Sequence, residues 1–119
     1  MCRSERGAVT AEAAVVLPTL AVFTLVMVWF VSWGVAAVRV QDAAREAARV
    51  VARGDPASAG TGLARQVAPP GSTVEVHAGP DTIEVVVTTR VRGPGGVFGF
   101  VPGVVVHGRA VAATETEGE

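Results

Sequence analysis

An uninterrupted apolar run near the start of the chain limits the folds open to this sequence. Residues 13–38 are 26 residues without one charged side chain, in a chain of 119 residues. About 20 such residues suffice for a helix to cross the hydrocarbon of a bilayer, so the run predicts a transmembrane helix with some tilt. Trp29, Ser32 and Trp33 lie late in the run, where an interfacial aromatic belt belongs.

A short polar segment, residues 1–7, precedes the run and ends in Gly7. In an ordinary secretory signal, an apolar core of about 7–15 residues comes first and a small-residue cut site follows it. Here the small residues Gly7 and Ala8 precede a much longer core. We therefore expect residues 1–7 to be a leader, removed by a cut between Gly7 and Ala8 that leaves the apolar helix in the mature protein.

Glu12 is an acidic residue at the amino-terminal edge of the run and the fifth residue after the expected cut. A charge at the bilayer centre costs about 2.5–3.5 kcal/mol, and less near the interface. Two interpretations are open. Glu12 stays in the headgroup zone, or it pairs in an assembly with the free α-amino group of Ala8 on a neighbouring copy or partner. The spacing from Gly7 favours the second.

Pro18 lies inside the run. It lacks a backbone donor and crowds the carbonyl of Ala14, which predicts a kink; an ordinary transmembrane proline is the alternative. The arginines around the run do not help to orient it. By the positive-inside rule, the side of a membrane helix with more Lys and Arg faces the cytoplasm, and four arginines follow the run closely. A count of arginines alone would therefore place the carboxyl side in the cytoplasm, although the rule weakens for a folded domain. These four are Arg39, Arg45, Arg49 and Arg53.

Beyond the run the helical period continues. Apolar residues recur at spacings of four, three and four, at Val40, Ala44, Ala47 and Val51. Charged residues fill the other faces, which we interpret as a solvated surface. Gly54 is placed to cap the helix and Pro56 follows it. One helix is therefore expected over residues 9–53, transmembrane in its first half and amphipathic in its second.

The rest of the chain predicts a small β head. Residues 55–62 have a linker-like composition, and residues 63–67 suit a short helical turn. Alternating apolar residues then predict strands at 74–78, 83–92 and 104–113, the first two joined by a turn. A three-stranded antiparallel sheet with one apolar face needs a cover, and the stripe from Val40 to Val51 is available.

The expected fold is α+β, a long amino-terminal helix packed against a small three-stranded antiparallel sheet. Its expected segments are a leader at 1–7, a transmembrane half-helix at 8–38, an amphipathic half-helix at 39–54 and a head at 55–119. The head includes a loop at 93–103 with Phe98 and Phe100, expected to be buried, an exposed apolar tip being the alternative. It ends in a disordered tail from residue 114.

The sequence contains no pattern typical of an enzyme. It carries one cysteine, Cys2, and a net charge of −1. Outside Arg39–Arg53 it has neither the clustered basic face nor the interleaved aromatics that would suit nucleic acid. His77 and His107 fall on polar strand faces without a third ligand nearby. We expect no catalytic residues, no metal, no cofactor and no small-molecule substrate.

The segment from Gly7 to Pro18 resembles the processing site and hydrophobic segment of TadE-like minor pilins. These are pseudopilins of tight-adherence (Tad/Flp) systems, a branch of the type IV pilus superfamily. Residues 41–49, Gln-Asp-Ala-Ala-Arg-Glu-Ala-Ala-Arg, resemble the second recognisable stretch of the family. The strong part of the resemblance covers residues 7–53.

The resemblance implies a minor pilin or assembly pseudopilin rather than a shaft subunit, because major Flp pilins are shorter and lack a head. Prepilin peptidase would cut after Gly7, and Glu12 would dock the helix into the pilus or its base. The expected partners are the membrane, the peptidase, other Tad pilins and the assembly platform. The expected location is the cytoplasmic membrane, with a single pass and the head outside the cytoplasm. A surface pilus is a further expected location. The alternative is an unprocessed single-pass protein with a binding or regulatory head.

Overall fold

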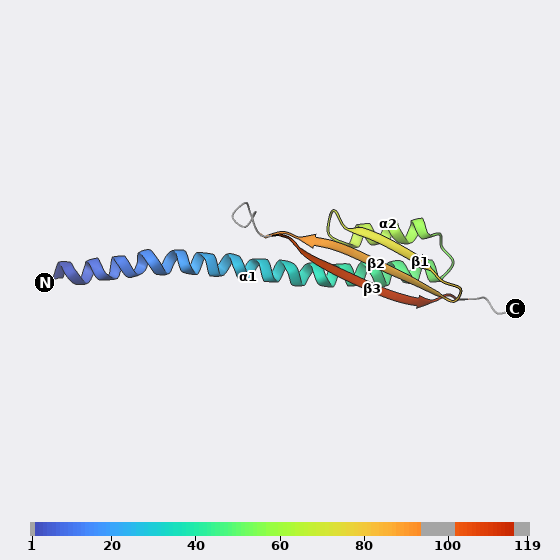
Figure 1. Ribbon diagram of the computed structural model, residues 1–119, viewed down its shortest axis with the longest axis horizontal. Coiled ribbons are helices and arrows are strands. Elements are labelled where there is room, and N and C mark those ends of the chain that lie inside the picture. Colours follow the sequence, from blue (N-terminus) through green and yellow to red (C-terminus); the bar gives the residue numbers. More distant parts are fainter. Residues whose placement is uncertain (1, 94–101, 116–119) are drawn as a thin grey trace.

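The computed structural model describes residues 2–93 and 102–115 and shows a rod with a small head along one end (Figure 1). The molecule measures 93 × 23 × 18 Å. It is an α+β fold, as predicted. In chain order its elements are α1 (Cys2–Ala52), α2 (Ala57–Val67), β1 (Thr73–Ala78), β2 (Thr82–Val91) and β3 (Val104–Ala113).

Helix α1 is continuous for 51 residues and passes through Pro18 without ending. It begins before the expected start at residue 9, so residues 2–7 are also helical. Its carboxyl end agrees with the prediction. Gly54 takes a left-handed φ of 99°, and its N–H donates to the carbonyl of Val51 at 3.1 Å. A glycine in this conformation is the usual way to stop a helix, because a side chain there would be strained.

The three strands form one antiparallel sheet in the order β1-β2-β3, which confirms the predicted topology. Val76 lies opposite Val85, and Val87 lies opposite Gly108 on the other side of β2. The alternation along β2 is regular, with Ile83, Val85, Val87 and Thr89 buried. Because successive residues of a strand point to opposite faces, this pattern turns one face of the sheet to the helix.

The core lies between that face and the second half of α1. The predicted stripe is confirmed, since Val40, Ala44 and Ala47 are fully buried and Val51 is 8% exposed. Alanines dominate the helix side, so the sheet can approach the helix backbone closely. The approach is closest at Gly108, where a Cβ would lie 2.3 Å from the carbonyl carbon of Val40.

The expected linker at 55–62 is wrong, because residues 57–62 belong to the 11-residue helix α2. Glycine and serine have low helix propensity, but tertiary packing overrides that preference. Gly60 and Ala64 are buried where α2 meets α1. A Cβ at Gly60 would lie 2.5 Å from a methyl group of Val51, so the small residues that suggested a linker are what allow two helices to pack.

Two contacts tie the edge strand β3 to α1. The Gln41 side chain donates to the carbonyl of Arg109 at 2.8 Å, and the Arg109 N–H donates to Gln41 Oε1 at 3.3 Å. The amide thus replaces a neighbouring strand at the open edge of the sheet. Farther along, the N–H of Glu115 donates to the carbonyl of Ala52 at 3.3 Å. The predictions for Phe98, Phe100 and residues 116–119 lie outside the described residues.

Candidate functional site

The first half of α1 extends beyond the head (Figure 1). Its large apolar side chains are exposed. Leu17 is 65% exposed, Phe23 59% and Val31 66%. In the most apolar 18-residue window of α1, no residue is buried by the rest of the chain. A soluble protein rarely leaves such a large apolar surface in water, and the core helix of a soluble domain would be covered. By length and composition α1 is able to cross a membrane, which fits a single-pass membrane protein.

Gly7, Ala8 and Glu12 lie near the free end of this surface. A Cβ at Gly7 would meet nothing within 4 Å, so packing within the chain gives no reason for glycine there. Ala8 and Glu12 are exposed and one helical turn apart, hence on the same face of α1. Among the ion pairs of the described residues, none involves Glu12. Packing and ion pairs within the described chain therefore assign no role to Gly7 or Glu12.

The hydroxyl groups of the apolar half are satisfied within the helix. Thr19 donates to the carbonyl of Val15 at 2.8 Å, Thr24 to Leu20 at 2.9 Å and Ser32 to Val28 at 2.9 Å. Such bonds suit a lipid environment, where water cannot serve as a partner. Thr19 bonds Val15 rather than Ala14, the carbonyl that Pro18 crowds. The predicted kink at Pro18 stays a prediction.

An aromatic cluster marks the place where the apolar half meets the head. Phe30 lies between the two tryptophans, with ring centroids 6.3 Å from Trp29 and 6.2 Å from Trp33. Val104, the first residue of β3, lines a small cavity of about 160 Å³ with these three rings. The end of the head therefore reaches down to the aromatic residues that the sequence places at the membrane boundary.

A groove of about 360 Å³ opens beside this cluster, between α1 and the end of β2. It brings together Arg39 and Arg90, which are 51 positions apart in the sequence. Sequence reasoning did not place these two residues at one groove, because only the packing of the sheet against the helix brings the end of β2 to this part of α1. The pattern of β2 does predict Arg90 at the strand end, but it gives no sign of its neighbour.

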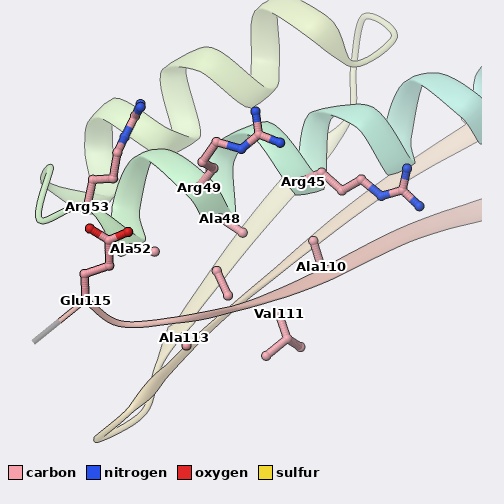
Figure 2. A pocket seen from close by; sticks show the side chains of 10 residues that line it. Arg45, Ala48, Arg49, Ala52, Arg53, Ala110, Val111, Ala113 and Glu115 are labelled. Carbon is pink, nitrogen blue, oxygen red and sulfur yellow. The ribbon is translucent and has the colours of Figure 1, made fainter.

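A second groove, of about 450 Å³, lies between the end of α1 and the end of β3. Figure 2 shows Arg45, Arg49 and Arg53 in a row along α1 above this groove. Arg49 lies 3.7 Å from Glu46, and both side chains are largely exposed, so the pair contributes little to stability. All three arginines are exposed, which agrees with the predicted solvated face of alternating charges; Arg45 and Arg49 as partner contacts are the alternative.

The two histidines lie on different outer strands, with β2 between them. His107 Nδ1 is 3.2 Å from the hydroxyl of Thr88, and His77 Nε2 is 3.6 Å from a carboxylate oxygen of Glu75. Within residues 2–93 and 102–115, no group of three or more histidine, cysteine or acidic side chains is arranged to hold a metal ion.

The comparisons with known proteins point to one family. The family model described as TadE-like protein matches residues 7–49. A protein of Mycobacterium tuberculosis named as an apoptosis inhibitor is 39% identical over 108 residues, covering 87% of this chain and 77% of its own length. This chain belongs to the TadE-like family. No solved structure matches it significantly.

Membership of the TadE-like family makes the chain a pilin-like protein associated with the Tad pilus system. The family is structural rather than enzymatic. The matched segment begins at Gly7 and ends at Arg49, so it contains both the expected cut site and nearly all of the stripe that packs on the sheet. The TadE-like resemblance predicted from residues 7–53 is confirmed.

Proposed function

We propose that this TadE-like protein is a minor pilin or pilus-assembly pseudopilin that prepilin peptidase cuts after Gly7. The observation that carries the proposal is the exposed apolar half of α1, which the head leaves uncovered. After the cut, this half would anchor the protein in the cytoplasmic membrane as a single pass with the head outside. It would then pack against helices of other Tad pilins and the assembly platform. No catalysis, cofactor or small-molecule substrate is needed for this role.

The surroundings of Gly7 support the proposed cut. The Gly7–Ala8 bond lies in the second turn of α1, and helix ends open at little cost, so a protease can gain access to it. The open space around Gly7 leaves recognition by a protease as a reason for its small size. Once the leader is removed, the Ala8 amine and the Glu12 carboxylate lie on one face of the helix. A neighbouring copy could pair with both, which would remove two charges from the lipid boundary.

The mature amino terminus tests the proposal most directly. Mass spectrometry of the membrane-extracted protein should find Ala8 first in cells with prepilin peptidase and Met1 in a peptidase-null strain. Gly7→Val should block the cut while leaving the head folded. Gly34→Val is the matched control, because Gly34 is also a helical glycine with open space around its α-carbon, and this variant should be cut normally. An intact Met1 in peptidase-positive cells would contradict the proposed processing.

The role of Glu12 has a separate test. Glu12→Gln removes the charge at nearly constant size, so membrane insertion should be unchanged while incorporation into pili falls. Glu5→Gln is the control, since Glu5 belongs to the segment that would be removed. Normal incorporation of Glu12→Gln would leave Glu12 without a docking role.

A second candidate is an unprocessed single-pass protein whose head binds a partner or regulates it. The Mycobacterium tuberculosis relative favours it, because its match covers 87% of this chain, whereas α1 holds 51 of the 119 residues. The similarity therefore includes much of the head, and that relative is named as an apoptosis inhibitor. This candidate predicts the same amino terminus with and without prepilin peptidase, so loss of processing in the null strain would exclude it.

A further inference from the structure

The groove between the ends of α1 and β3, about 450 Å³ in volume, lies along the open edge of the sheet. In an antiparallel ladder, the backbone groups of successive residues point alternately toward the neighbouring strand and away from it. The N–H and carbonyl of Arg109 are bonded to Gln41 of α1, so they point away from β2. Val111 and Ala113 lie two and four positions farther along β3 and therefore point their N–H and carbonyl groups to the same open side.

These outward backbone groups have no partner within the described chain. No hydrogen bond among the described residues uses the outward N–H or carbonyl of Val111 or Ala113. Both residues are exposed and line the groove. Beyond them the edge closes again, because the N–H of Glu115 donates to the carbonyl of Ala52. The stretch between Arg109 and Glu115 is therefore free to bond a short added strand, as sheet edges do in peptide recognition.

The helix side of the groove is positively charged. Figure 2 shows Arg45, Arg49 and Arg53 along α1, on the other side of the groove from β3. They recur every four residues, which is about 6 Å along a helix axis. Alternate residues of a strand lie about 6.6–6.8 Å apart on one face, so acidic residues at every second position of a strand would match this row.

The charges of the row are available to a partner. Arg45 and Arg53 take part in none of the ion pairs found among the described residues. Arg49 pairs at 3.7 Å with Glu46, an exposed and therefore weak contact. Glu115 also lines the groove, at its end, but three arginines against one glutamate leave the lining net positive.

We propose that this groove binds an extended acidic segment of a partner protein, which adds to β3 as a fourth strand. The backbone of the segment pairs with Val111 and Ala113, and its acidic side chains meet the arginines of α1. Between the two sides the lining residues are small, so no bulky side chain fills the groove; they are Ala48, Ala52, Ala110 and Ala112. The alternative is that the arginines only protect the edge strand from aggregation, and it predicts no binding. The proposal goes beyond the pilin role and does not require a cut at Gly7.

Fluorescence anisotropy with the full chain in a neutral detergent tests the proposal. The probe is a labelled peptide that alternates threonine with glutamate and carries three glutamates, one for each arginine. It should bind, and more weakly as salt is added, because exposed charges are screened. The same peptide with glutamine in place of glutamate should bind much more weakly.

Two N-methylated forms of the probe test for a strand while keeping its charge. In an extended chain the amides of alternate residues point to the same side, so methylating either the glutamate or the threonine amides blocks one side only. One form should lose about 30-fold in affinity, the equivalent of about 1 kcal/mol for each of two hydrogen bonds. The other form should bind like the unmethylated probe.

Charge variants of the protein test the arginine row. Arg45→Gln combined with Arg49→Gln should lower the affinity for the probe about 5-fold, the equivalent of about 0.5 kcal/mol for each exposed ion pair. Arg65→Gln combined with Arg92→Gln is the matched control, since it removes the same charge from exposed sites outside the groove.

Proline variants of the protein test the edge of β3. Val111→Pro removes an N–H that the ladder with β2 does not use, a place where strands tolerate proline, and should weaken binding severalfold. Val105→Pro removes an N–H that points to the same side near the other end of β3, outside the groove, and should leave binding unchanged. Circular dichroism checks that the head of each variant stays folded, and the methylated probes test the wild-type chain in any case.

Failure of the alternating probe to bind, or equal binding of its glutamine form, would overturn the proposal. Loss of affinity with both methylated forms or with neither would overturn it too, because the groove would then attract charge without pairing a strand. Tighter probe binding after Glu117→Gln combined with Glu119→Gln would overturn a partner as the occupant, since the acidic end of the chain itself would then compete for the groove. None of these outcomes depends on the amino-terminal residue, so they are separate from the test of processing.

Discussion

Replacing Gly108 by alanine should push the sheet away from α1. The new Cβ would lie 2.3 Å from the carbonyl carbon and oxygen of Val40 and 2.6 Å from the nitrogen of Gln41. Ordinary contacts begin near 3.4 Å, so the two elements must separate by about 1.1 Å. These atoms belong to the helix backbone, and no rotamer change can move them aside.

A gap of this size is costly because the helix and sheet form the core together. A separation of about 0.5–1 Å already forfeits a quarter to a half of each van der Waals contact. Overpacking a core typically costs about 1–3 kcal/mol, and the backbone clash places Gly108→Ala at the upper end. A domain of this size rarely draws more than about 3–5 kcal/mol from its core, so most of the stability of the head would be lost.

Two other glycines provide matched controls for the same substitution. At Gly60 the obstacle is a methyl group of Val51 at 2.5 Å, which can move in part, so Gly60→Ala should cost about 1–2 kcal/mol. At Gly62, an exposed position in α2, a Cβ would meet nothing within 4 Å. Gly62→Ala should therefore stabilise the head by about 0.5–1 kcal/mol through helix propensity.

Pulse proteolysis across a urea series, with the full chain in detergent, would measure the free energy of unfolding of the head. From most to least stable, the expected order is Gly62→Ala, wild type, Gly60→Ala and Gly108→Ala. If Gly108→Ala unfolded within about 0.5 kcal/mol of wild type, the close approach of β3 to α1 would be wrong.

Three further predictions follow from the head and its junction with the membrane. Gln41→Ala removes both bonds to the Arg109 backbone and should lower the free energy of unfolding by about 1 kcal/mol in the same assay; no change would mean that water replaces the amide. Glu84→Gln breaks a 3.1 Å pair with an exposed arginine, so its cost should stay below about 1 kcal/mol and shrink as salt is added, whereas a salt-independent loss would contradict a surface pair. In bilayers, phospholipids brominated near the headgroup should quench the fluorescence of Trp29 and Trp33 more than phospholipids brominated near the bilayer centre. The reverse order would refute the placement of these tryptophans at the membrane interface.

Local pattern was sufficient for α1 and the three strands, although not for α2. Apolar residues spaced three or four positions apart identified the stripe from Val40 to Val51, and alternating apolar residues identified all three strands. Both patterns record which face of an element is buried. Gly54 and the turn after Ala78 marked element ends through backbone preferences that act within a few residues. The TadE-like identity also rested on the contiguous segment that begins at Gly7.

Composition gave a wrong prediction where small residues suit both a linker and a helix–helix contact. Gly60 lies in a stretch typical of a linker, yet the same lack of a side chain lets α2 pack on Val51. Only the contact with another helix distinguishes these two uses of glycine. Gln41 likewise looks like one more polar residue of a solvated face until β3 is placed beside it.

The sequence by itself determined that this chain has an apolar helix long enough to cross a membrane, an amphipathic continuation and three strands, because each follows from hydrophobic periodicity along the chain. The tertiary structure alone decided how far the head descends along α1. That descent depends on Gly108 fitting against Val40, and it brings the end of β2 to the part of α1 that carries Arg39. Such a meeting of distant residues is fixed by the packing of helix against sheet, which no local pattern encodes.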